Sequence, residues 1–150
     1  MLCYKNGALA REQIRDRFAN ESWDEFNKLI EQTPPGCDGV TGFYFPLPEI
    51  IPPGITGEYF FSTNLVKTPV KPPIRLESVP PSVHPRAILE SQFLSIKSRI
   101  KTLTSHSGPG NSHHVHRLII SGGSSQNPTI RQLAAVCDQF AVYMFHLTVF

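Results

Sequence analysis

The amino-acid sequence predicts an α/β fold in which helices alternate with short strands, and three observations support this prediction. Apolar residues recur three and four positions apart in several separate segments, which is typical of helices that bury one face. The apolar run Arg117–Ser121 has the length of a strand and meets Gly122 and Gly123, after which a helical pattern begins. The 150 residues suffice for about one domain.

The first predicted elements are a short strand, Leu2–Tyr4, and a helix that begins after an Asn-Gly turn signal. Ala10, Ile14 and Phe18 are spaced four residues apart, so they lie on one face of that helix, which we expect to be buried. The charged residues on its other side are expected to contact water: Arg11, Glu12, Arg15 and Asp16.

A second helix is predicted after Ser22, because Ser22 and Glu25 have the spacing of a capping box at a helix start. The sequence Pro34-Pro35-Gly36 is expected to end it. Its apolar face consists of Trp23, Phe26, Leu29 and Ile30.

Prolines and aromatic side chains dominate the middle of the chain, and ten of the 14 prolines fall between residues 46 and 85. Proline cannot donate to a sheet ladder, so residues 42–61 are predicted to form short edge strands and loops. We interpret residues 46–85 as a proline-rich insertion and expect its later part, residues 64–85, to be an exposed connection. Six aromatic rings favour packing over disorder: Phe43, Tyr44, Phe45, Tyr59, Phe60 and Phe61.

The clearest helical pattern covers residues 86–103, and a surface loop at residues 104–114 is expected to end it. Arg117–Ser121 is then predicted to be a buried strand. The last helix is expected to begin at Pro128 with Asn127 as its N-cap. The apolar faces of the two helices consist of Leu89, Phe93, Ile96, Ile100 and Leu103 in the first, and Ile130, Leu133, Ala134, Cys137 and Phe140 in the second.

Charge and composition argue against several classes of partner. The net charge of +2 is too small to indicate a nucleic acid or a membrane surface, so neither is expected. No apolar stretch approaches the about 18 residues of a transmembrane helix. Cys3, Cys37 and Cys137 have no close spacing and are expected to be reduced thiols, which is typical of a cytoplasmic protein.

The pair Gly122–Gly123 has two interpretations. Glycine permits positive φ and lets a ligand approach where a Cβ would stand in the way. A following helix start offers free N–H groups and a partial positive charge, so the segment is a plausible nucleotide platform. Neither of the two common glycine-rich phosphate motifs is present, and a tight strand-to-helix turn without a ligand is the alternative.

Other polar groups point to no catalytic or metal site. In His113–His116, His114 and His116 would face the same side of a strand, but two ligands do not make a zinc site, so no metal is expected. Cys137 lies on an apolar helix face and is interpreted as a buried thiol, not a nucleophile. The aspartates are interpreted as solvated charges, and none is assigned a catalytic role: Asp16, Asp24, Asp38 and Asp138.

Several segments resemble one family. LIISGGSSQNPTIRQLAAVCDQF resembles the strand–Gly-Gly–helix segment of the FGGY carbohydrate kinases. CYKNGALAREQIRDRF, SWDEFNKLI and GFYFPLPEIIPP resemble the eukaryotic xylulose kinase branch of that family, and RAILESQFLSIKSRI resembles its long helix. The resemblance runs in order from Leu2 to about Tyr143. After Ala141–Tyr143 the sequence departs from the family, which continues there into a small-residue helix beside the adenine pocket.

The resemblance implies an actin-like, ribonuclease H-like ATPase domain. Residues 1–150 match only part of the C-terminal, nucleotide-side domain, and the N-terminal sugar-binding domain with its catalytic base is absent from them. The implied reaction transfers the γ-phosphoryl group of ATP to D-xylulose and yields D-xylulose 5-phosphate, with Mg²⁺ bridging the phosphates. The alternatives are another FGGY sugar kinase, or a truncated, non-catalytic chain that binds a partner. The oligomeric state stays open.

The resemblance also implies a set of cofactor-binding residues. Gly122 and Gly123 match the backbone that lies against the nucleotide, and Ser124 follows them in the loop. Asn127 matches an asparagine that contacts the adenosine while it caps the helix. Trp23 matches an aromatic position on the adenine side, or else anchors its helix in the core.

Overall fold

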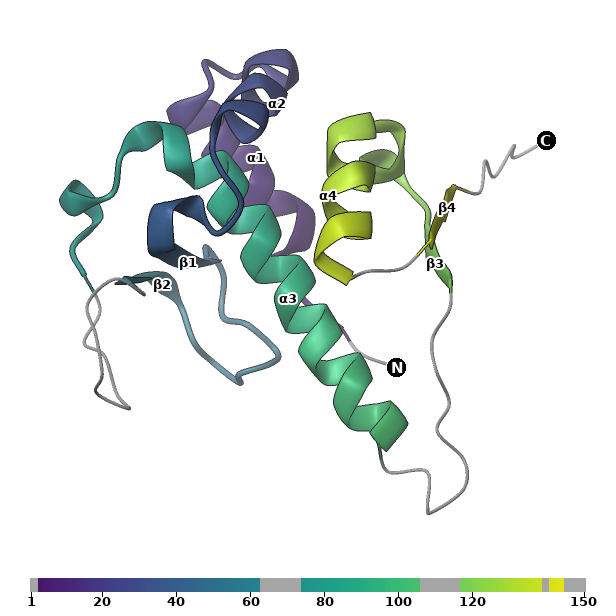
Figure 1. Ribbon diagram of the computed structural model, residues 1–150. Coiled ribbons are helices and arrows are strands. Elements are labelled where there is room, and N and C mark those ends of the chain that lie inside the picture. The colour runs from purple at the N-terminus through teal and green to yellow at the C-terminus, as the bar shows by residue number, and fades with distance from the viewer. Residues whose placement is uncertain (1–2, 63–73, 106–116, 139–140, 145–150) are drawn as a thin grey trace. The chain divides into compact units, whose positions relative to one another are not determined.

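The computed structural model describes residues 3–62, 74–105, 117–138 and 141–144 (Figure 1). The chain divides into two compact units, Met1–Ser91 and Gln92–Phe150, which are considered separately below. The helices and strands in chain order are α1 (Gly7–Phe18), α2 (Trp23–Gln32), β1 (Val40–Phe45), β2 (Gly57–Ser62), α3 (His84–Ser105), β3 (Arg117–Ile120), α4 (Pro128–Asp138) and β4 (Ala141–Met144).

Both helices at the start of the first unit were predicted, and each buries the expected face. Ala10 and Ile14 of α1 and Phe26 and Ile30 of α2 are buried. Ser22 caps α2 as predicted, because its side chain accepts a hydrogen bond of 3.3 Å from the Glu25 N–H.

Two expectations for the start of the chain are wrong. Arg11, which was expected in water, is half-buried, and burial lowers its pKa despite the opposing effect of Glu12. Cys3 and Tyr4 belong to no strand, and Leu2 lies outside the described residues.

The hairpin β1–β2 confirms the predicted strands among residues 42–61. The two strands are antiparallel, with Phe43 opposite Tyr59 and Gly42 opposite Phe60. Tyr44 and Phe60 are buried, and their rings meet edge to face at 5.5 Å. The Tyr44 ring lies over Gly42. A Cβ built at residue 42 would therefore stand only 2.7 Å from the Tyr44 hydroxyl oxygen.

The expected exposed connection at residues 64–85 is only partly correct for the part that the structure describes: residues 75, 77, 78 and 80–82 are exposed, but others are buried. Ile74 joins the hairpin through a bridge to Phe60, with its N–H donating to the Phe60 carbonyl at 2.7 Å. Val79, Val83 and His84 are buried, with exposed fractions of 4%, 4% and 1%. The spaced apolar side chains turn this segment toward the core, although its prolines exclude it from regular strands.

Helix α3 begins at His84 and ends at Ser105, two residues beyond the prediction at each end. Residues 84–89 are all buried, so the start of α3 is enclosed on every side and not only along the predicted apolar face. Farther along, Phe93, Ile96 and Ile100 are half-buried, and Leu94 is exposed. The remainder of the predicted loop, residues 106–114, lies outside the described residues.

The buried side chain of Arg86 fastens α3 to the end of α2. The Arg86 guanidinium donates to the carbonyls of Ile30 and Thr33 at 3.1 and 3.0 Å, and it pairs with Glu90 at 2.6 Å. These carbonyls belong to the last turn of α2, where carbonyls lack partners within the helix and a cation is favourable. Arg86 therefore caps α2 from a neighbouring helix.

The second unit is built around β3, α4 and β4. β3 and β4 are parallel, with Leu118 opposite Val142, and α4 packs against β4. Ile130, Leu133 and Ala134 of the predicted apolar face of α4 are buried, whereas Cys137, which was expected to be buried, is half-buried, and Phe140 lies outside the described residues. The predicted burial of β3 is wrong at Ile119, which is 60% exposed. Among the described residues β3 has β4 as its only strand partner, so much of its surface stays open.

Candidate functional site

The glycine pair forms an open turn. Gly122 has φ +83°, a conformation that favours glycine, and it precedes a 3₁₀ turn over Gly123–Gln126. Both glycines are exposed. A Cβ built on either one would meet no atom within 4 Å, so the backbone here faces unoccupied space.

Hydrogen bonds within the turn hold its shape. The N–H and the hydroxyl of Ser125 both donate to the Gly122 carbonyl, at 3.0 and 2.6 Å. Ser125 is only 1% exposed, so these bonds are partly shielded from water. The Asn127 N–H donates to the carbonyl of Ser124 at 3.3 Å, and Ser124 itself is half-buried. The guanidinium of Arg131 donates to the Ser125 carbonyl.

Asn127 is the N-cap of α4, as the sequence predicted. Its side-chain oxygen accepts a hydrogen bond of 3.1 Å from the Ile130 N–H. This bond also corrects the expectation of several free N–H groups at the helix start. Pro128 has no N–H, and the N–H of Arg131 donates to the Asn127 carbonyl at 3.2 Å. The open part of the site is therefore the glycine backbone more than the helix start.

Trp23 lies in the other unit, at the first residue of α2. It is half-buried, and its ring meets Phe26 edge to face at 5.2 Å. The guanidinium of Arg15 lies 4.8 Å from the centre of the indole ring. These contacts agree with Trp23 as an anchor between α1 and α2, while its role toward adenine stays a prediction.

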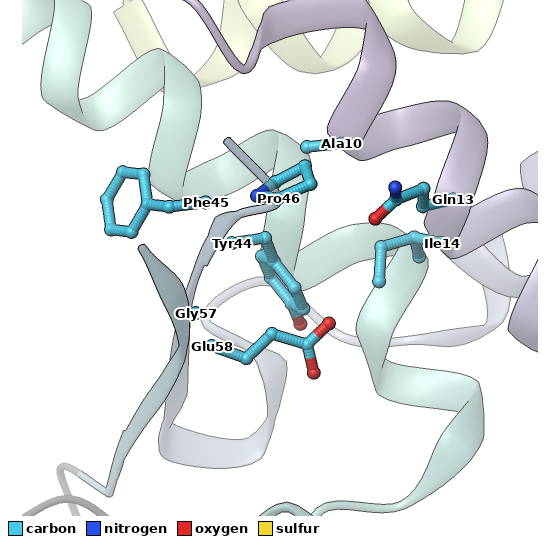
Figure 2. A pocket seen from close by; sticks show the side chains of 8 residues that line it. All are labelled: Ala10, Gln13, Ile14, Tyr44, Phe45, Pro46, Gly57 and Glu58. Carbon is cyan, nitrogen blue, oxygen red and sulfur yellow. The ribbon is translucent and has the colours of Figure 1, made fainter. Parts of the chain in front are cut away.

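The first unit also contains a cavity of about 220 Å³ that the sequence did not suggest. Figure 2 shows its wall, in which Gln13 of α1, Tyr44 of β1 and Glu58 of β2 provide the polar groups. Glu58 forms an ion pair with Arg17. The other lining residues are Ala10, Ile14, Phe45, Pro46 and Gly57.

Sequence reasoning missed the buried pair of Tyr44 and His84. Their hydroxyl and Nδ1 are 2.9 Å apart, and the His84 ring stacks on Phe18 with 4.1 Å between ring centres. Burial raises the pKa of Tyr44 above its ordinary range and lowers that of His84 to about 4. Little in the sequence indicates this pair, because His84 lies near the end of a proline-rich stretch that is typical of a loop.

Sequence reasoning also missed Arg131. No local motif pairs a helix side chain with a carbonyl six residues earlier, so the bond from Arg131 to Ser125 emerges only from the folded turn.

No metal site is found among the residues that the structure describes, since no three His, Cys, Asp or Glu side chains come together there. His113–His116 lies outside those residues. Asp16, Asp24 and Asp38 are exposed, in agreement with solvated charges, and the surroundings of the Asp138 side chain are not described. None of the helices in the described residues is long and apolar enough to cross a membrane.

The comparisons with known proteins all match carbohydrate kinases. The C-terminal domain of the FGGY family of carbohydrate kinases matches residues 2–145. Xylulose kinase 2 of Arabidopsis thaliana is 37% identical over 149 residues, covering 95% of this chain and 25% of that protein. Probable D-xylulose kinase A of Aspergillus fumigatus is 35% identical over 147 residues, covering 89% of this chain and 26% of that protein.

The solved structures include xylulose kinase from Bifidobacterium adolescentis. It superposes with a TM-score of 0.69 at 23% identity, covering 95% of this chain and 25% of that one. This chain therefore spans about a quarter of the length of the proteins it matches.

Proposed function

Because this chain belongs to the FGGY family of carbohydrate kinases and has the actin-like fold of the C-terminal domain, we propose that it is the nucleotide-side part of a xylulose kinase. The proposed reaction of the whole enzyme is the ATP-dependent phosphorylation of D-xylulose to D-xylulose 5-phosphate. The names of the relatives support this choice of sugar. The three cysteines, none of which forms a disulfide, favour a reducing, cytoplasmic setting.

The open glycine turn is the observation that carries the proposal. Gly122 and Gly123 present backbone to unoccupied space, so a flat ligand can lie close to it without meeting a side chain. The hydrogen bonds of buried Ser125 and of the Asn127 cap support the shape of the turn. We assign Gly122, Gly123, Ser124 and Asn127 to the nucleotide, and the role of Trp23 toward adenine stays an implication of the family resemblance.

ATP and Mg²⁺ are the cofactors that the proposal requires. A Cβ at Gly123 would meet no atom within 4 Å, so the backbone there is open to the approach of a nucleoside. In the described parts of the chain no group of three acidic, His or Cys ligands is available, so we assign Mg²⁺ to the phosphates of ATP and to parts of the enzyme outside this chain. When bound, Mg²⁺ neutralises charge on the phosphates during transfer.

The substitution Gly123→Val tests the proposal. A Cβ at residue 123 meets no atom within 4 Å and φ there is not positive, so valine fits the fold while it blocks the approach of a ligand. We expect calorimetry to detect weak ATP binding by the unaltered chain and a loss of about tenfold or more in Gly123→Val, equal to about 1.4 kcal/mol. Gln126→Val, at an exposed position of the same turn, is the control. Equal affinities would remove the turn from the site.

A non-catalytic role in partner binding is the second candidate. Ile119 and Val136 of the second unit are each 60% exposed, and exposed apolar side chains are common in interaction surfaces. Absence of any ATP binding by the unaltered chain would favour this candidate. A third possibility, a kinase for a different sugar, depends on the parts of the relatives that this chain does not include.

A further inference from the structure

We propose that Arg131 is a positioning residue of the glycine turn. Its guanidinium holds the carbonyl of Ser125 and thereby fixes the backbone from Gly122 to Asn127 in the shape that receives the nucleotide. This inference rests on the proposed function, because it gives Arg131 a role at the same site.

The hydrogen bonds form a continuous chain from the helix to the glycine. Arg131 donates to the carbonyl of Ser125, and Ser125 donates to the carbonyl of Gly122 through both its N–H and its hydroxyl. Ser125 is almost fully buried, where an unsatisfied polar group is costly. Loss of the Arg131 guanidinium therefore removes the hydrogen bond to the Ser125 carbonyl, and Ser125 is the residue that holds Gly122 in the turn.

The position of Arg131 within α4 is electrostatically unfavourable for the helix itself. Arg131 is the fourth residue of α4, and the positive end of a helix dipole disfavours a cation in the first turn. The charged hydrogen bond to the Ser125 carbonyl offsets this repulsion, because bonds from an ionised donor are roughly twice as strong as neutral ones. The guanidinium of Arg131 thus forms its hydrogen bond with the turn that precedes the helix.

Arg131 is also separate from the core of its unit. Ile130, Leu133 and Ala134 are the buried residues of α4, whereas Arg131 is half-buried. A substitution that keeps an unbranched side chain at residue 131 should leave the packing of α4 in place. The turn can then be loosened without unfolding the helix.

The experiment compares Arg131→Met, which removes charge and donors, with Arg131→Lys, which keeps the charge but not the planar fork. The control is Gln132→Met, at the neighbouring exposed position. All variants are made in the 150-residue chain. The measurements are amide hydrogen exchange at Ser125 and Asn127, whose N–H groups donate within the turn, and ATP affinity by calorimetry.

We expect Arg131→Met to speed exchange at these two amides by about tenfold, since local opening exposes them. We expect ATP affinity to fall by about tenfold, with exchange in the first unit unchanged. Arg131→Lys should retain only part of the exchange protection of these amides and only part of the ATP affinity. Gln132→Met should change neither the exchange rates nor the affinity. A purely structural role would instead raise exchange throughout α4.

The possible failures are distinguishable. Unchanged exchange at Ser125 and Asn127 in Arg131→Met would show that Arg131 does not support the turn, whether or not ATP binds. Faster exchange with undiminished ATP affinity would overturn the positioning role alone. Full recovery of ATP affinity in Arg131→Lys, abolished by high salt, would replace positioning with simple charge attraction. Failure of the unaltered chain to bind ATP would refute the proposed function and, with it, the role of Arg131 toward a nucleotide. The exchange data would still show whether Arg131 supports the turn.

Discussion

The hydroxyl of Tyr44 lies 2.9 Å from Nδ1 of His84, and both side chains are almost fully buried. They join strand β1 to the start of helix α3, and the ring of Phe60 also meets His84 edge to face at 5.4 Å. A neutral imidazole suits this apolar setting, because a buried charge without a counterion is costly.

The first prediction concerns stability in mild acid. Burial, and to a smaller extent Arg17, lower the pKa of His84 from 6.5 to about 4. The unfolded chain therefore takes up this proton more readily, so the contribution of His84 is complete above about pH 6.5 and is lost as the pH falls toward 4. The shift corresponds to a loss on the order of 3 kcal/mol.

Urea unfolding at pH 7 and pH 4.5 measures this loss. His84→Gln keeps a polar side chain without the titration, so we expect its free energy of unfolding to change less over the same interval. Parallel declines in the unaltered chain and in His84→Gln would show that other groups cause the acid sensitivity.

The second prediction concerns Glu49, which is 5% exposed and accepts four hydrogen bonds. The donors are the N–H groups of Lys5 at 2.7 Å, Ile50 at 2.7 Å and Asn6 at 3.2 Å, and the side chain of Asn6 at 2.9 Å. Burial alone would raise the pKa of Glu49, but these bonds outweigh it and the pKa is lowered.

A glutamine at residue 49 would replace one acceptor oxygen by an NH₂ group, which donates, although the surrounding N–H groups need an acceptor there. We expect Glu49→Gln to lower the free energy of unfolding by about 1–3 kcal/mol at pH 7. The contribution of the carboxylate should vanish as the pH falls below its ordinary pKa and through the lowered one, because protonation of Glu49 mimics the amide. Glu12→Gln, at an exposed position of α1, is the control in urea unfolding, and an equal effect of the two substitutions would contradict this account.

The third prediction concerns the reactivity of the cysteines. Cys37 is fully buried, and its thiol lies 3.7 Å from the Glu90 carboxylate. Burial, and then the negative charge of Glu90, raise the pKa of Cys37 to about 12. Since the thiolate is the reactive form, Cys37 should resist alkylation at pH 8, whereas exposed Cys3 should react.

Mass spectrometry after brief treatment with iodoacetamide distinguishes the two sites. We expect modification of Cys3 first, and of Cys37 only after denaturation in urea. Early labelling of Cys37 in the folded chain would mean that the segment around it opens readily.

The fourth prediction concerns activity. Residues 117–137, which contain the glycine turn, include no Asp or Glu that could act as a catalytic base, and the chain covers about a quarter of its relatives. We expect no phosphorylation of D-xylulose by the chain alone in a coupled ADP-release assay, even where calorimetry detects ATP binding. Measurable turnover would show that the chain contains a base that the proposal assigns elsewhere.

Features that depend on neighbouring residues could be predicted from the sequence. Ser22 and Asn127 cap their helices as expected, because a cap joins residues three positions apart. The helical periodicity likewise located the buried faces of α1, α2 and α4. The glycine turn could be identified from its composition, although its openness required coordinates.

Features that join distant segments could not be predicted. His84 lies 40 residues from Tyr44, and the segment that contains it carries the prolines of an exposed loop. Periodicity also failed for the start of α3, because residues 84–89 are enclosed by several elements at once and every side is buried. The burial of β3 was overestimated, since a run of apolar residues does not say how many strands lie beside it.

The contact between Gly42 and the Tyr44 ring has an evolutionary consequence. Any side chain at residue 42 would collide with the Tyr44 hydroxyl, which in turn would leave the imidazole of His84 without its partner. We therefore expect relatives that retain this tyrosine and histidine to retain glycine at the position of residue 42, and relatives with a larger residue there to have replaced the tyrosine–histidine pair.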